Sequence, residues 1–275
     1  MLINSIELLK EARKNKKRVV AFNVYNLETI QAAFIASKNK QLPLILAFGE
    51  GYLKYTPFEI IVAMVKALDM SHPYPVVLHL DHCKSFHNIK MAIEAGFTSV
   101  MYDGSHLTFE ENIKTTKEVV NYAHDRGIGV EGELGYMNPE DGSEAEGILV
   151  ETYTSPFQAK IYIEQTKVDT LAVAIGNAHG VYIKKPVLDL ERLKAIYQEA
   201  GVPIVLHGCS GIDQEQISKA VEIAVVKINV NTEIALTGGR RIRELLEEKA
   251  GVDVRLETLM EAVQQAMVNT MESFL

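Results

Sequence analysis

This 275-residue sequence has few cysteines, no excess of positive charge and no long apolar segment. The two cysteines, Cys83 and Cys209, are not spaced as a disulfide framework, so we expect a reducing compartment and no structural disulfide. The formal net charge of −8 argues against binding to nucleic acid or to an anionic membrane, which both favour basic proteins. No apolar run approaches the roughly 18 residues that span a bilayer, and residues 1–17 are lysine-rich rather than a signal peptide. We therefore expect a cytoplasmic protein.

The sequence does contain a regular alternation of short apolar segments with amphipathic ones. The apolar segments that we expect to form strands are 19–24, 43–48, 76–80, 99–102, 129–132, 171–175, 203–206 and 225–229. Strands that alternate with helices predict an α/β protein with a (β/α)8 fold, the TIM barrel. We expect a single domain of residues 1–275, with an extra N-terminal helix (3–15) that closes the barrel bottom and an extra C-terminal helix (256–274). A doubly wound open sheet is the alternative, but residues 23–27 lack the glycines of its first turn.

Three histidines follow expected strands. They are His82, His179 and His207. Active sites of barrels form at the carboxyl ends of the strands, and three imidazoles with an open fourth position describe a catalytic zinc site. A single histidine more often binds no metal, but three at equivalent positions favour a metal site. His79 lies inside a strand and is expected to be a core or supporting group.

Several carboxylates lie near the same strand ends. Asp81 precedes His82 on a backbone that we expect to be extended, so the two side chains should point in different directions. Asp81 could then exchange a proton with a substrate hydroxyl, or it could orient an imidazole; the residues alone leave both open. Glu131, Glu133 and Asp103 could hold a second cation or simply form a polar layer at the barrel rim.

Glycines and hydroxyl residues end the last three strands. Gly180, the run Gly208 to Gly211 and the run Asn229 to Thr232 occupy positions where barrel phosphate sites commonly form, although ordinary turns would have a similar composition. Lys184, in the loop that follows the sixth strand, could add positive charge. The long polar segment 135–151 carries Glu140 and is expected to be a functional loop.

Taken together, these motifs resemble the zinc-dependent class II aldolases, and the fructose-bisphosphate and tagatose-bisphosphate aldolases most of all. The resemblance runs from about residue 19 to about residue 267. The segments that carry it are His79-Leu80-Asp81-His82, Val130-Glu131-Gly132-Glu133-Leu134-Gly135, Ala174-Ile175-Gly176-Asn177-Ala178-His179-Gly180, Leu206-His207-Gly208-Cys209-Ser210-Gly211 and Lys227-Ile228-Asn229-Val230-Asn231-Thr232-Glu233.

The resemblance implies reversible cleavage of a ketose bisphosphate, such as fructose or tagatose 1,6-bisphosphate, to dihydroxyacetone phosphate and an aldehyde through a metal-stabilised enediolate. It implies zinc ligands (His82, His179, His207), an alternative or second metal site (Asp103, Glu133), an acid/base (Asp81), a loop acid that moves the dihydroxyacetone phosphate proton (Glu140), and contacts to substrate (Asn23, Gly180, Gly208, Ser210, Asn229, Thr232). It also implies a monovalent cation (Na⁺ or K⁺) near the phosphate. Arg255 would reach the far phosphate from a neighbouring subunit, so a homodimer or homotetramer is expected.

Three departures from the family pattern affect these expectations. The loop lacks a Gly-Gly pair before Glu140 and has Pro139 there, Gly49 replaces a serine near the far phosphate, and Val254 replaces a proline. The last two concern the far end of the substrate. We therefore keep as an alternative an aldolase for a ketose 1-phosphate with a sulfonated or unphosphorylated aldehyde half.

Other functions remain open from the sequence. A Schiff-base aldolase would need a lysine at the site, and Lys227 is the candidate. A zinc hydrolase on the same barrel and a non-catalytic paralogue are the further alternatives. The residues do not distinguish fructose from tagatose stereochemistry, a dimer from a tetramer, or zinc from another divalent ion.

Overall fold

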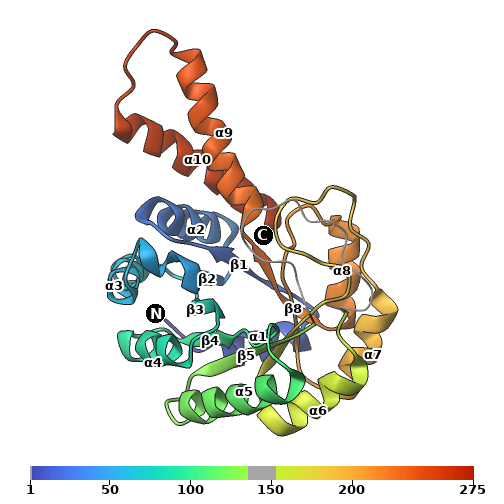
Figure 1. Cartoon of the computed structure of the whole chain (residues 1–275). Coiled ribbons are helices and arrows are strands. Elements are labelled where there is room, and N and C mark those ends of the chain that lie inside the picture. Colours follow the sequence, from blue (N-terminus) through green and yellow to red (C-terminus); the bar gives the residue numbers. More distant parts are fainter. Residues whose placement is uncertain (1, 136–152) are drawn as a thin grey trace.

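The computed structural model describes residues 2–135 and 153–275, and its centre is a closed barrel of eight parallel strands (Figure 1). Each strand pairs with the next, and β8 pairs with β1. This arrangement confirms the TIM-barrel prediction and excludes the open sheet. The strands are β1 (Val19–Asn23), β2 (Leu44–Gly49), β3 (Val76–Cys83), β4 (Ser99–Tyr102), β5 (Gly129–Leu134), β6 (Thr170–Val173), β7 (Ile204–Leu206) and β8 (Val225–Val230).

Helices surround the barrel and cover its outer face. Side chains that accept first-turn N–H groups start several of them, as expected for asparagine, serine, threonine and aspartate at such positions: Asn26, Ser85, Thr108, Ser155 and Asp189. The helices are α1 (Ser5–Lys14), α2 (Leu27–Lys40), α3 (Phe58–Asp69), α4 (Phe86–Ala95), α5 (Phe109–His124), α6 (Pro156–Thr166), α7 (Leu190–Ala200), α8 (Gln214–Ile223), α9 (Thr232–Glu248) and α10 (Leu256–Phe274), with a 3-10 helix η1 (Glu50–Lys54) after β2.

Three strand boundaries differ from the prediction in ways that affect the site. β3 continues through Cys83 and β5 through Leu134, because residues with polar side chains pair as well as apolar ones once they face the barrel interior. β6 ends at Val173, so residues 174–178 separate it from His179. His179 therefore belongs to a loop, and contacts within the loops must hold it in place.

The barrel interior is apolar at the amino-terminal end of the strands and polar farther along. Leu9 and Ala12 of α1 pack against Val19, Ile45 and Val77, which confirms that the first helix closes the barrel bottom. The polar side chains buried farther along include Asn23, His79, Asp81, Asp103, Glu131, Glu133, Lys227 and Asn229. Burying that many polar groups is unfavourable unless they pair, so their contacts define the site.

The last two helices, α9 and α10, pack against each other as a hairpin. α10 also packs on α2, and Figure 1 shows the far end of the hairpin projecting away from the barrel. Near that end Leu246, Val252 and Leu256 are exposed by 47%, 68% and 68%. Apolar side chains gathered on a projecting element are typical of a surface that contacts another protein. No helix in the described residues is both long and apolar enough to cross a membrane.

Candidate metal centre and substrate cavity

A cavity of about 150 Å³ opens at the carboxyl ends of the strands. It lies between the ends of β1, β3, β7 and β8 and the loop after β6. The predicted site residues that line it are Asn23, Asp81, His179, Gly180, His207, Gly208, Ser210, Asn229 and Thr232. Val181, Asn231 and Leu236 also line it and were not predicted, because nothing in their local sequence distinguishes them from ordinary loop and helix residues.

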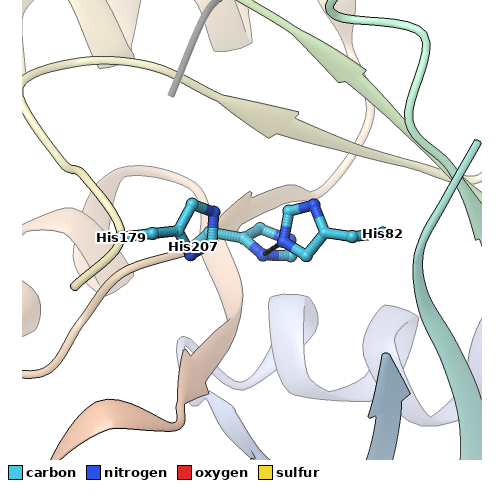
Figure 2. A group of neighbouring side chains, drawn as sticks. All are labelled: His82, His179 and His207. Atoms are coloured by element: carbon cyan, nitrogen blue, oxygen red, sulfur yellow. Dashed lines mark hydrogen bonds between the residues drawn. The ribbon is translucent and has the colours of Figure 1, made fainter. Parts of the chain in front are cut away.

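Figure 2 shows that the rings of three histidines, His82, His179 and His207, converge, and the last two of them line this cavity. The ring centroid of His82 lies 4.7 Å from that of His179 and 4.5 Å from that of His207. One ring nitrogen of each lies within 4.8 Å of the others, close enough to share one metal ion. The Nε2 atom of His179 is buried and has no hydrogen-bond partner in residues 2–135 and 153–275. Three converging imidazoles, one with an unsatisfied buried nitrogen, fit the ligand set of a zinc ion.

The carboxylate of Glu131 determines which nitrogen of His207 carries the proton. His207 Nε2 lies 2.8 Å from Glu131 Oε1. Burial would raise the pKa of Glu131, but Lys227 and the hydrogen bond from His207 outweigh burial and lower it. Burial and then His82 lower the pKa of His207, so its ring is neutral. An ionised carboxylate only accepts, so Nε2 donates the proton and Nδ1 keeps its lone pair, 2.9 Å from Nε2 of His82.

A second group of metal-compatible side chains also includes His82. Its Nδ1 atom lies 3.4 Å from Asp103 Oδ2 and 3.5 Å from Glu133 Oε2. Burial and then Asp103 raise the pKa of Glu133 well above its ordinary value. Glu131, which the sequence had grouped with these two acids, is not part of this cluster; its carboxylate pairs with Lys227 at 2.8 Å.

The backbone at the end of β3 departs from our prediction. We expected an extended chain through Asp81 and His82, and this was wrong: His82 has a φ of +46°, in the left-handed region. The pairing of β3 with β4 also shifts register between Leu80 and Cys83. A regular strand sends consecutive side chains to opposite faces, so this irregularity lets two adjacent residues serve one site. Asp81 lines the cavity, and His82 meets the other two histidines.

Contacts between two loops hold His179 near His207. The Tyr182 hydroxyl accepts from the N–H of Ala178 at 2.7 Å and donates to the carbonyl of Gly208 at 2.9 Å. Gly208 has a φ of +64°, and a Cβ there would clash with the carbonyl oxygen of Ala178. Only glycine allows this close approach of the two loops. The glycine after His207 is thus explained by packing as well as by turn geometry.

Two amide side chains clamp Asp81. Asn23 Nδ2 donates to its Oδ2 at 2.9 Å, and Asn229 Nδ2 donates to its Oδ1 at 3.1 Å. Burial would raise the pKa of Asp81, but the positive charge of neighbouring side chains, Lys227 among them, outweighs burial and lowers it. The carboxylate is therefore ionised at neutral pH and able to accept a proton. The Oδ1 atom of Asn229 is buried and has no hydrogen-bond partner among the described residues, so it can accept from a ligand in the cavity.

Another wall of the cavity consists of glycines and hydroxyl groups. Gly180 and Gly208 lie beside Ser210, whose Oγ accepts from the N–H of Glu233 at 3.3 Å. Thr232 is the first residue of α9, so the amino end of this 17-residue helix borders the cavity. Free N–H groups and the positive end of the helix dipole at such a position favour an anion.

Neither lysine nor arginine lines this cavity in the described part of the chain. Lys184 is exposed and is not among the lining residues. Arg255 lies at the start of α10, where its 83%-exposed side chain pairs with Glu257. Glu140 lies outside the described residues. In composition, the segment 136–152 around it has five acidic residues and no basic one, so it cannot supply positive charge.

An aromatic residue closes the edge of the site near Gly49. A Cβ on Gly49 would lie 3.4 Å from Cε2 of Tyr52, so the tyrosine ring covers this position. The Tyr52 ring packs on Tyr25 with centroids 4.9 Å apart, and its hydroxyl accepts from Nδ2 of Asn231 at 3.2 Å. The departure at Gly49 is visible in the sequence, but the tyrosine that covers it is not, because their contact depends on how residues 50–54 fold.

The sequence suggested no role for Cys83. In the structure it takes part in the contacts that connect Glu50 of η1 with the segment that follows β3. Its thiol lies 3.2 Å from Glu50 Oε1 and 3.3 Å from the carbonyl of Ser85. Glu50 also accepts from the N–H of Lys84 at 3.0 Å and from Nδ2 of Asn88 at 2.7 Å. Burial and then Glu50 raise the pKa of Cys83, so the thiol stays neutral and is unsuited to bind a metal.

Burial of His79 predicts a pH dependence of stability. Burial and then Lys227 lower the pKa of His79 from 6.5 to about 3. Between these values the unfolded chain binds a proton that the folded chain does not, so stability is lost as pH falls below 6.5, by about 1.4 kcal/mol per pH unit for one such group. In His79→Gln, the zinc-free protein should lose about 2 kcal/mol less than the parent between pH 6.5 and 5.0. Urea unfolding at both pH values measures this, and equal losses would contradict it.

Comparisons with known proteins agree on one family. The family model described as fructose-bisphosphate aldolase class-II matches residues 3–275. A fructose-bisphosphate aldolase of Geobacillus stearothermophilus is 43% identical over 91% of this chain and 88% of its own. One of Staphylococcus aureus is 40% identical over 99% of this chain and 97% of its own. Among solved structures, the YdjI aldolase of Escherichia coli K12 aligns with a TM-score of 0.88 and 34% identity, covering 100% of this chain and 96% of that one.

Proposed function

Because the chain belongs to the class II fructose-bisphosphate aldolase family and is therefore an aldehyde-lyase, we propose that it reversibly cleaves a ketose 1,6-bisphosphate to dihydroxyacetone phosphate and glyceraldehyde 3-phosphate. Fructose and tagatose 1,6-bisphosphate are the proposed substrates. One observation carries the proposal: three converging imidazoles lie beside an ionised, amide-clamped carboxylate at the mouth of the barrel.

His82, His179 and His207 are the proposed zinc ligands. The buried, unpartnered Nε2 of His179 and the Nδ1 lone pair of His207 support this assignment. A zinc ion bound there supplies Lewis-acid stabilisation of the negative charge that develops on substrate oxygens during cleavage. Asp103 and Glu133, together with His82, form the proposed second metal position.

Asp81 is the proposed acid/base. In the cleavage direction its carboxylate takes the proton of the C4 hydroxyl, the C3–C4 bond breaks and the aldehyde carbonyl forms. The electron pair stays on the dihydroxyacetone phosphate half, which then takes up a proton. Two amide donors hold the carboxylate in one orientation, which supports a role that needs an aimed proton acceptor. Glu140 is the proposed source of the second proton, and it lies outside the described residues.

The glycine and hydroxyl wall is the proposed site of the dihydroxyacetone phosphate half. Gly180, Gly208, Ser210 and Thr232 would surround the phosphate, with the amino end of α9 beside it. Asn229 supports the proposal with an unpartnered buried Oδ1 that can accept from a substrate hydroxyl. Asn23 would contact substrate from the other side of Asp81, and Lys184 is proposed to add charge near the rim.

The far end of the substrate leads to a second proposal about assembly. No basic side chain in the described residues lines the cavity, so a second phosphate needs a cation from elsewhere. Arg255 on the projecting α9–α10 hairpin of a neighbouring subunit is the proposed source, and the exposed apolar residues of that hairpin support a homodimer or homotetramer.

The same lack of positive charge favours a second candidate substrate. If no arginine arrives from a neighbour, an uncharged aldehyde half suits the tyrosine and amide groups around Gly49 better than a phosphate does. The second candidate substrate is therefore a ketose 1-phosphate with an uncharged aldehyde half. A sulfonated aldehyde half is negatively charged, so it would fit only if Arg255 of a neighbouring subunit reaches the site.

The rival chemistries receive less support. Lys227 is 1% exposed, pairs with Glu131 and does not line the cavity, so a Schiff base at its Nζ has no access to substrate. A zinc hydrolase would not need the anion-binding wall. A non-catalytic paralogue would not need an ionised Asp81 beside the histidines.

A substrate panel tests the proposed function. We expect cleavage of a 1,6-bisphosphate that EDTA abolishes and zinc restores, with a lower kcat/KM for the matching 1-phosphate. Arg255→Ala should raise KM for the bisphosphate by about 10- to 100-fold, because a hydrogen bond to a charged group contributes about 1.5–3 kcal/mol, and should leave the 1-phosphate unaffected. Arg243→Ala, an exposed arginine of the same helix hairpin, is the matched control.

The outcomes of the substrate panel distinguish the two candidate substrates from each other and from the absence of aldolase activity. Equal or better turnover of the 1-phosphate, with no effect of Arg255→Ala, would favour the second candidate over the bisphosphate. No cleavage of any ketose phosphate in the presence of zinc would defeat both.

Four expectations stay predictions. A monovalent cation, Na⁺ or K⁺, is proposed beside the phosphate, and zinc rather than another divalent ion is proposed as the native metal. We also propose that residues 1–275 act as one domain and that the protein works in the cytoplasm.

A further inference from the structure

A chain of buried polar side chains runs through the barrel interior from the histidines to the first helix. We call it the interior chain. Its members, in order, are His207, Glu131, Lys227, His79, Ser99 and Ser5. All are buried, with exposed fractions of 6% or less. The aldolase chemistry derived above uses only the first member, so the others need a separate explanation.

The upper part of the interior chain consists of charged groups. Glu131 accepts from His207 through Oε1 at 2.8 Å and from Nζ of Lys227 through Oε2 at 2.8 Å. Each oxygen of the carboxylate thus has its own donor, which prevents the group from rotating. Because the pair lies on β5 and β8, it also ties two strands to the residue that follows β7.

The lower part fixes the orientation of Lys227. Its Nζ lies 3.3 Å from Nε2 of His79, and a neutral imidazole accepts there only if its proton is on Nδ1. That Nδ1 lies 2.8 Å from Oγ of Ser99, which accepts in turn from Ser5 of α1 at 2.9 Å. Every member then has a defined donor or acceptor role, from the barrel bottom to His207.

We propose that Glu131 and Lys227 are positioning residues that hold His207 as the Nε2–H tautomer, so that its Nδ1 lone pair faces the metal position. The proposal rests on the metal centre proposed above and adds the groups that prepare it. The ion pair also explains why a lysine and a glutamate occupy the inside of the barrel, where apolar side chains would pack without desolvating charge.

The test replaces the charged pair without leaving a buried charge. Glu131→Met with Lys227→Met keeps the interior neutral and similar in volume. A methionine offers no strong acceptor to Nε2 of His207, so the ring loses the contact that fixes its proton on Nε2 and leaves Nδ1 free. We expect zinc affinity, measured by competition with a chelator, to fall by about 10- to 100-fold, the range found when groups that orient a metal ligand are removed.

Met101→Leu is the matched control. Met101 is fully buried in the same interior layer and pairs in register with Glu131, but it has no polar contact to lose. It should change zinc affinity by less than about twofold, because volume-conserving swaps are well tolerated. Zinc affinity of the double variant within the same twofold range would overturn the proposal.

A measurement on the unmodified protein remains decisive if the double variant does not fold. In zinc-free protein with ¹⁵N-labelled histidine, NMR should find the His207 proton on Nε2; a proton on Nδ1 would overturn the proposal. Failure of the metal centre itself is distinguishable, because the parent protein would then bind no zinc at all.

Discussion

Replacing His179 with alanine should lower zinc affinity by more than about 100-fold while the zinc-free protein stays within about 1 kcal/mol of the parent in stability. The Nε2 atom of His179 is buried without a hydrogen-bond partner in the described residues, so its removal breaks no hydrogen bond at that atom in the zinc-free fold. Leaving such an atom unsatisfied costs about 1–3 kcal/mol, which offsets the packing lost with the ring. A chelator competition gives the affinity, and urea unfolding in EDTA gives the stability.

His124→Ala is the control for the loss of a histidine. His124 lies at the end of α5, where its half-exposed ring pairs with Asp169 at 2.9 Å, far in the sequence from the three converging rings. Its replacement should leave zinc affinity unchanged. A His179→Ala protein that retained the parent's affinity would remove His179 from the ligand set and with it the three-histidine centre.

Replacing Asp81 with alanine should lower kcat for cleavage by about 10²- to 10⁴-fold, the usual contribution of a positioned acid or base. Zinc affinity should change little, because Asp81 receives its hydrogen bonds from the amides of Asn23 and Asn229. Steady-state kinetics with saturating zinc, together with a chelator competition, separate the two effects.

A half-reaction sharpens the test of Asp81. Exchange of the dihydroxyacetone phosphate C–H proton with solvent does not require the C4 hydroxyl, so it should persist in Asp81→Ala while carbon–carbon cleavage is lost. Loss of both reactions together would indicate that Asp81 maintains the structure of the site and is not specifically the acid/base at the C4 hydroxyl. Unchanged cleavage would remove it from the mechanism.

The barrel was predictable because its strands are buried on both faces and are therefore largely apolar, apart from the polar side chains that face the barrel interior. The alternation of such segments with helices leaves few folds, and the strand ends then place His82, His207, Asp81 and Asn229 at one rim. Local sequence periodicity contains that information. His179 was less predictable, because residues 174–178 separate it from β6 and contacts of Tyr182, Gly208 and Asn177 hold its loop.

What the sequence could not supply depends on contacts between distant strands. Glu131 was grouped with Glu133 by its spacing, but it pairs with Lys227, which is 96 residues away along the chain. Tyr52 covers Gly49 only because η1 folds back over β2. The left-handed turn at His82 has no distinct signal in the local sequence, since it shows neither glycine nor asparagine and most histidines adopt an ordinary backbone.

That turn at His82 also has an evolutionary consequence. Among the described residues, the other non-glycine positions with positive φ are Lys16, Gln41 and Lys167, which end helices, where such a backbone is common. At the end of a strand the same backbone costs a histidine about 1–2 kcal/mol. Glycine or asparagine would relieve this backbone strain. A homologue that no longer catalyses the reaction would therefore become more stable by replacing this histidine.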